Sequence, residues 1–94
     1  MPRAVVRLRT VVDGEKFKWQ LKELGDIKRI DEILEGVVFA LARSPEVIGQ
    51  PTANPNVWAV PTARWTGVSL VIYYSFDSRQ VVLEAVTVAD IELN

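Results

Sequence analysis

Residues 68–88 constrain the fold of this chain most strongly. Two runs of β-branched and aromatic residues, 68–76 and 80–88, flank the short polar link Asp77-Ser78-Arg79. This pattern predicts two antiparallel strands joined by a hairpin turn. Apolar side chains occupy both faces of the first run, which is typical of a central strand covered on both sides. Segments upstream must therefore supply the cover.

The residues before Pro45 predict an edge strand and two helices. Residues 4–12 alternate loosely and predict the edge strand. Asp13 is placed to be the N-cap of a first helix that runs to about Leu24. We interpret Gly36, inside the second helix, as a point of close contact with the first helix or the sheet. The apolar stripe of the second helix recurs at steps of three and four: Ile27, Ile30, Leu34, Val37, Val38 and Leu41.

The middle of the chain predicts little regular structure. Residues 45–55 are rich in Pro, Gly, Asn and Thr and predict a loop. Residues 56–60 predict a short strand, and residues 61–67 a turn or bulged connection. The order β-α-α-β-β-β predicts a single α+β domain spanning residues 1–94, with two helices on one face of a mostly antiparallel four-stranded sheet.

Composition excludes several classes of function. The 94 residues contain no cysteine and no histidine, which removes disulfides, thiolate metal sites and nucleophile pairs that need histidine. We therefore expect no metal and no cofactor. No apolar run has membrane-spanning length, and we expect a cytoplasmic protein without membrane contact.

Charge is unevenly distributed along the chain. Up to Arg29 there are eight Lys/Arg against four acids, giving +4, and the rest has three against eight, giving −5, for a net charge of −1. A basic front attracts an anionic partner. The alternative is that these lysines solvate the outer face of a helix.

Three further features point to a known family. The helical pair ends in Leu-Ala-Arg-Ser-Pro at residues 41–45, and a short strand and a glycine-containing turn follow. The strand at 70–77 then matches an Arg-x-x-Tyr-x-x-Asp pattern through Tyr74 and Asp77, although Val71 stands in place of the arginine. With the predicted order of elements, these features resemble the RelE/ParE superfamily of bacterial type II toxin–antitoxin toxins.

The resemblance implies a toxin that is neutralised by an antitoxin protein. One branch of the family inhibits translation by cleaving mRNA on the ribosome as a metal-independent endoribonuclease, another acts on DNA gyrase, and such toxins serve in plasmid stabilisation. The missing arginine and the acidic C-terminus, with Asp90 and Glu92, leave two alternatives open. One is a non-catalytic RelE/ParE-like binding module, and the other is an unrelated small α+β subunit that forms a homodimer through its sheet.

Metal-free RNA cleavage needs a proton acceptor, cations that hold the phosphate and an acid for the leaving oxygen. Tyr73 and Tyr74 point to opposite faces of their strand, so one of them belongs to the core. The candidate catalytic residues are Arg64, Tyr74 and Arg79. The candidate binding residues are Arg7, Arg9, Lys16, Lys18, Trp19, Lys22, Trp58 and Trp65.

Overall fold

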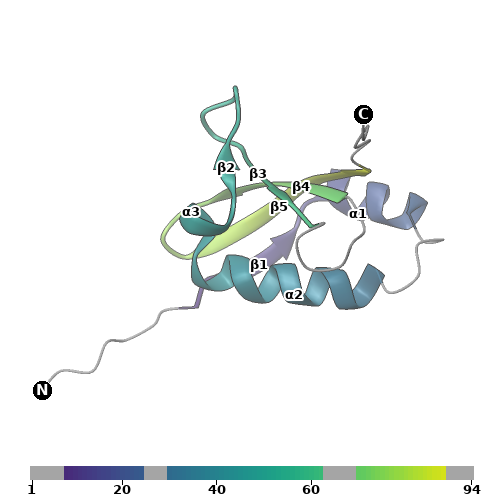
Figure 1. The fold of residues 1–94 in the computed structure, drawn as a ribbon, viewed down its shortest axis with the longest axis horizontal. Coiled ribbons are helices and arrows are strands. Elements are labelled where there is room, and N and C mark those ends of the chain that lie inside the picture. The colour runs from purple at the N-terminus through teal and green to yellow at the C-terminus, as the bar shows by residue number, and fades with distance from the viewer. Residues whose placement is uncertain (1–7, 25–29, 63–69, 89–94) are drawn as a thin grey trace, which may run out of the picture.

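A computed structural model describes residues 8–24, 30–62 and 70–88 (Figure 1). It has the predicted α+β architecture, with helices packed on a mostly antiparallel sheet. The elements in chain order are β1 (Thr10–Asp13), α1 (Glu15–Glu23), α2 (Ile30–Arg43), α3 (Pro45–Ile48), β2 (Gln50–Pro51), β3 (Trp58–Pro61), β4 (Leu70–Phe76) and β5 (Gln80–Val88).

The sheet is organised around the predicted hairpin. Its five described strands run in the order β1-β5-β4-β3-β2, so β4 is central and pairs antiparallel with both neighbours. Asp77 closes the β4–β5 turn, where its Oδ1 accepts hydrogen bonds from the N–H groups of Arg79 at 2.7 Å and Gln80 at 2.9 Å. The strand β1 lies at an edge, as predicted, and pairs in parallel with β5.

The segment predicted as a loop contains two regular elements, α3 and β2, so the sheet has one strand more than predicted. Pro45 is at the start of α3, where a proline costs nothing because that N–H has no helical partner. Thr52 holds the turn after β2, since its Oγ1 donates to the carbonyl of Val57 at 2.8 Å and accepts from the N–H of Asn54 at 3.2 Å. The richness in Pro, Asn and Thr therefore marks the ends of short elements in this segment.

The helix α2 covers the sheet with a stripe that is shifted from the predicted one. Ile33, Val37 and Leu41 are its buried side chains, and Leu34 and Val38 flank them. Ile33 was not in the predicted stripe. The interpretation of Gly36 is wrong, because Gly36 is exposed and a Cβ atom there would meet nothing within 4 Å.

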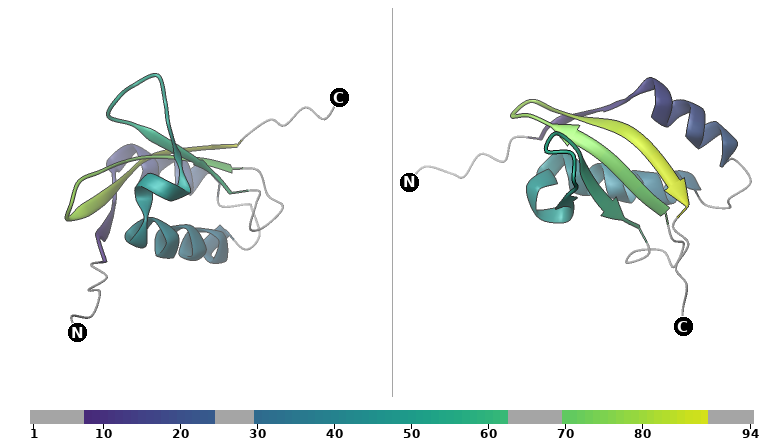
Figure 2. Two further views of the ribbon diagram at one scale, coloured as in Figure 1. Left: turned by 60° about the vertical axis from the view of Figure 1, so that its left-hand side comes forward. Right: turned by 90° about the horizontal axis from the view of Figure 1, so that it is seen from above.

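The helix α1 begins after Gly14 and not after Asp13, which is the last residue of β1. The N–H of Gly14 donates to the carbonyl of Leu83 at 2.8 Å, and a Cβ atom at Gly14 would lie 2.7 Å from that oxygen. The chain therefore turns into α1 while still held against β5. Beyond Leu83, α1 replaces β1 beside β5 (Figure 2), and Gln20 Oε1 accepts a hydrogen bond from the N–H of Val86 at 2.8 Å.

The two faces of the sheet differ in their cover. On the inner face, Leu70, Ile72 and Tyr74 are fully buried in one core cluster with α2. On the outer face, Val71 and Tyr73 are half-buried, and seen from above no described helix crosses β4 or β5 (Figure 2). The prediction of cover on both faces is therefore met on one face only within the described residues.

Candidate functional site

Tyr74 lies in the core. Its side chain is fully buried, and its hydroxyl donates a hydrogen bond to the carbonyl of Pro45 at 2.6 Å. Burial raises the pKa of Tyr74 to about 12, against the opposing effect of a hydrogen bond from the N–H of Gly49 and with a smaller contribution from the charge of Glu46. The hydroxyl therefore keeps its proton at neutral pH and fixes α3 to β4.

Gly49 is required by this arrangement. A Cβ atom at Gly49 would collide with the Tyr74 hydroxyl and would lie 2.8 Å from the carbonyl oxygen of Ala59. Because the second of these atoms belongs to the backbone of β3, it has little freedom to move away. The glycine thus allows α3 and β2 to pass close over Tyr74.

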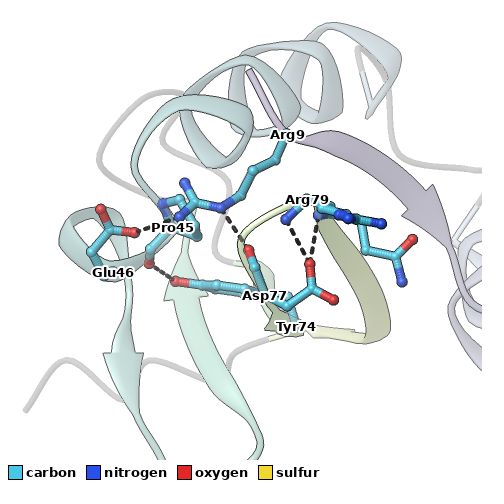
Figure 3. A network of polar contacts seen from close by, with 7 residues as sticks. Arg9, Pro45, Glu46, Tyr74, Asp77 and Arg79 are labelled. Atoms are coloured by element: carbon cyan, nitrogen blue, oxygen red, sulfur yellow. Dashed lines mark hydrogen bonds and ion pairs between the residues drawn. The ribbon is translucent and has the colours of Figure 1, made fainter. Parts of the chain in front are cut away.

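Arg9 is engaged in structural contacts (Figure 3). Its Nε donates to the carbonyl of Asp77 at 2.7 Å, and its Nη2 lies 3.8 Å from Glu46 Oε2. Its guanidinium also stands 5.7 Å from the ring centroid of Phe76, a distance at which a cation is attracted to an aromatic face. Arg9 thereby ties the start of β1 to α3 and to the β4–β5 turn.

The Tyr-x-x-Asp pair has a structural role in this fold. The carboxylate of Asp77 is exposed, and the two N–H groups of the turn lower the pKa of Asp77 below its ordinary value, that of Arg79 first and that of Gln80 second. Tyr74 and Asp77 therefore hold α3 and the turn, respectively (Figure 3). Arg79 is exposed at the turn, and Arg64 lies outside the described residues. The structure therefore does not bring Tyr74 and Arg79 together as one site.

The predicted binding residues of α1 share an exposed face. Lys16, Lys18 and Lys22 are exposed, and Trp19 is 69% exposed. Lys18 Nζ forms an ion pair with Glu15 at 3.5 Å. The face also contains a shallow hollow lined by Glu15, Lys16, Trp19, Gln20 and Glu23. Its charge is mixed, because acids and lysines alternate around the tryptophan.

The remaining predicted binding residues do not join this face. Trp58 is half-buried and packs edge to face on Phe76, with ring centroids 5.3 Å apart and an interplanar angle of 66°. Trp58 therefore belongs to the partly buried side chains that pack against the core. Arg7 and Trp65 lie outside the described residues.

The outer face of the sheet contains a feature that the sequence analysis missed. Tyr73 pairs with Ala85 and Tyr74 pairs with Leu83, so a β-bulge leaves Glu84 without a partner residue on β4. Ser75 Oγ donates a hydrogen bond to Glu84 Oε2 at 2.9 Å. The buried positions 81, 83 and 86 break the alternation expected of a regular strand, but this break is visible only in the structure, since the residues around Glu84 are all apolar.

Comparison with known proteins identifies the fold. No protein-family model and no curated protein matches the chain. Among solved structures, the fold is similar to a chain of the crystal structure of the toxin–antitoxin complex RelBE2 from Mycobacterium tuberculosis. The TM-score is 0.71 at 20% identity, and the match covers 89% of this chain and 94% of that chain. This chain has a RelE-like toxin fold. The RelE/ParE-like architecture expected from the sequence is thereby confirmed.

Two features are absent from the described residues. Within residues 8–24, 30–62 and 70–88, no group of three or more acidic side chains is placed to hold a metal ion. No described helix is long and apolar enough to cross a membrane.

Proposed function

We propose that the chain is the toxin of a bacterial toxin–antitoxin system and is bound and neutralised in the cytoplasm by an antitoxin protein. The observation that carries this proposal is the similarity to a chain of a toxin–antitoxin complex over nearly the full length of both chains. A shared fold alone does not define a function. The proposal therefore also draws on the surface of this chain.

Several large apolar side chains are exposed on the described surface, and their burial by a protein partner would be favourable. Large apolar side chains on the surface of a small domain are typical of interaction sites when they gather in patches. Trp19 on α1 and Phe39 on α2 are both at least 60% exposed, and Arg43 stacks 3.7 Å from the ring centroid of Phe39. The exposed large apolar side chains of the described residues are Leu8, Val12, Trp19, Phe39, Val47 and Val88.

Of the two target classes that the resemblance implies, the described residues favour a protein target such as DNA gyrase over cleavage of mRNA on the ribosome. Tyr74 is buried and protonated, and Arg9 is held by Glu46 and Asp77. A net charge of −1 is also unfavourable for a protein that binds RNA phosphates, because such binding is driven by cationic side chains that release counterions.

Expression in bacteria tests the toxin function. We expect inducible expression of this chain alone to arrest growth, and co-expression with the product of the adjoining reading frame to restore it. A Tyr74→Phe variant is a matched control, because it removes the buried hydroxyl and keeps the ring. If Tyr74 is structural, this variant should remain toxic. Unimpaired growth on strong induction of the wild-type chain would contradict the proposal.

Two assays with purified protein separate the targets. We expect inhibition of gyrase-catalysed supercoiling and no mRNA fragments in a ribosome-dependent cleavage assay. Discrete mRNA fragments would show that the target is translation.

A non-catalytic binding module is the second candidate. It is favoured by the outer sheet face, where Glu84 is bound by the neutral Ser75 and no described lysine or arginine forms an ion pair with it. In that case the chain would bind the product of the adjoining reading frame without arresting growth and without affecting either assay.

A further inference from the structure

We propose that the outer face of β4 and β5 binds an antitoxin segment that is apolar except for one lysine or arginine, and that Glu84 receives this cation. The inference rests on the proposed function and specifies the chemistry of the partner. It is carried by two independent observations, the apolar character of the face and the position of the Glu84 carboxylate.

The outer face is apolar and open. Val71, Tyr73, Val82 and Ala85 are half-buried there. Seen from above, no described helix crosses β4 or β5 (Figure 2). Val12 extends the face onto β1, where it pairs in register with Val82 and is 41% exposed. Removing such side chains from water is the main favourable contribution to protein association. A partner with apolar side chains would gain most from this face.

Glu84 is held in place on this face. The bulge gives it an extra position in β5, and the hydroxyl of Ser75 fixes its Oε2 at 2.9 Å. Its Oε1 reaches toward the junction of β1 and α1, because a Cβ atom at Gly14 would lie 3.6 Å from it. Bulges frequently aim a side chain at a functional position. The carboxylate is thus oriented before any partner arrives.

The charge of Glu84 selects the partner. Arg9 pairs with Glu46 and Lys18 pairs with Glu15, and no described lysine or arginine forms an ion pair with Glu84. A segment that covered this face without a donor of its own would leave a carboxylate buried and unpaired, which is strongly unfavourable. A lysine or arginine in the segment supplies the missing charge and adds a charge-assisted hydrogen bond.

The same charge disfavours two other occupants. An RNA strand would bring phosphates toward Glu84, and like charges repel. A second copy of this chain, related by a two-fold axis through the face, would bring a second Glu84. No described lysine or arginine pairs with Glu84 to neutralise these two negative charges. Like charges that face each other weaken an interface. An apolar segment with one cation is the occupant that fits both the surface and its charge.

Binding of the full-length chain to the product of the adjoining reading frame, measured by calorimetry, tests the inference. We expect Glu84→Gln to weaken binding at least about tenfold, because truncating one member of a buried charge pair has a large effect. Glu84→Lys should weaken it further. Glu35→Gln is the matched control, because Glu35 is exposed on α2, and it should bind like the wild type. Thermal unfolding of each variant confirms that the fold is kept.

A charge exchange gives a second readout. Each lysine or arginine of the adjoining product is changed to glutamate in turn, and we expect one of these variants to bind the Glu84→Lys chain more tightly than it binds the wild type.

The outcomes separate the inference from the proposed function. If the wild-type chain binds the product and Glu84→Gln binds it equally well, the inference is overturned and the proposed function stands. If the wild-type chain does not bind the product, both fail. If the chain alone forms a dimer whose dissociation constant changes with Glu84→Gln, the face is an interface between copies and the inference is overturned.

Discussion

Two adjacent tyrosines on β4 show how differently the two faces of this sheet are used. Tyr74 points inward, is fully buried and donates its hydroxyl to the carbonyl of Pro45. Tyr73 points outward and is half-buried on a face that no described helix crosses. The inner face is therefore committed to holding the fold, and the outer face remains available for binding.

The polar residues divide in the same way. On the inner side, Arg9 and Glu46 pair with each other. On the outer side, Glu84 has a neutral partner, Ser75, and no described cation. A residue that matches a functional motif therefore need not belong to a functional site, since the motif residue Tyr74 is buried in the core. If the two faces are divided in this way, substitutions on the inner face should destabilise the chain more than substitutions on the outer face.

The largest expected difference is between two neighbouring aliphatic residues of β4. Ile72→Ala should lower the free energy of unfolding by about 2–5 kcal/mol, because it leaves a cavity in a fully buried position. Val71→Ala on the outer face should lower it by about 1 kcal/mol. Urea unfolding of both variants measures the difference. Equal losses would show that the outer face is buried as deeply as the inner face.

Two glycines should respond with opposite sign. Gly49→Ala should destabilise the chain by about 1–3 kcal/mol, because the added methyl group meets the Tyr74 hydroxyl and the carbonyl of Ala59. Gly36→Ala should stabilise it by up to about 1 kcal/mol, since alanine favours the helix and the position is open. Thermal unfolding of the two variants measures both changes in stability. A Gly49→Ala chain as stable as the wild type would disprove the close approach of α3 to Tyr74.

The two tyrosines themselves give the third test. Tyr74→Phe should lower the free energy of unfolding by about 1–3 kcal/mol, because the buried carbonyl of Pro45 loses its donor. Tyr73→Phe should change it by about 0.5 kcal/mol or less. The same urea measurement applies to both variants.

The difference in unfolding free energy between the wild type and Tyr74→Phe should also depend on pH. The folded chain holds the Tyr74 proton more tightly, with a pKa of about 12 against 10.0 for an ordinary tyrosine. This contribution to stability is therefore fully present below pH 10 and is lost as the pH rises toward 12. Absorbance titration of a Tyr73→Phe chain follows Tyr74 alone, because the chain has two tyrosines. Stability curves of wild type and Tyr74→Phe that stay parallel from pH 9 to 12 would contradict the assignment.

The sequence predicted those elements whose apolar residues recur at the period of a helix or a strand and face the core. The hairpin of β4 and β5 and the helix α2 were predicted because their apolar periodicity is long and regular. The short elements α3 and β2 were missed, since four and two residues are too few to show a period. The N-cap was assigned to Asp13, but the strand continues through that residue because β5 pairs with it.

The candidate site was harder to predict than the fold. The structural role of Arg9 depends on contacts with Glu46 and Asp77, and no local pattern reports contacts between residues so far apart in the chain. Tyr74 was chosen for its place in a motif, but the sequence does not state which of two adjacent tyrosines faces inward. Glu84 was overlooked because a strand was assumed to alternate without interruption, and the bulge breaks that alternation.

The parallel pairing of β1 with β5 has a consequence for synthesis of the chain. Thr10 pairs with Gln80, and Asp13 pairs with Leu83, so the first described strand cannot find its neighbour until residues 80–83 have left the ribosome. Contacts between such distant residues form late and slow folding. A nascent chain would therefore lack a finished sheet until β5 has emerged, so the apolar core can close only after these strands have been synthesised.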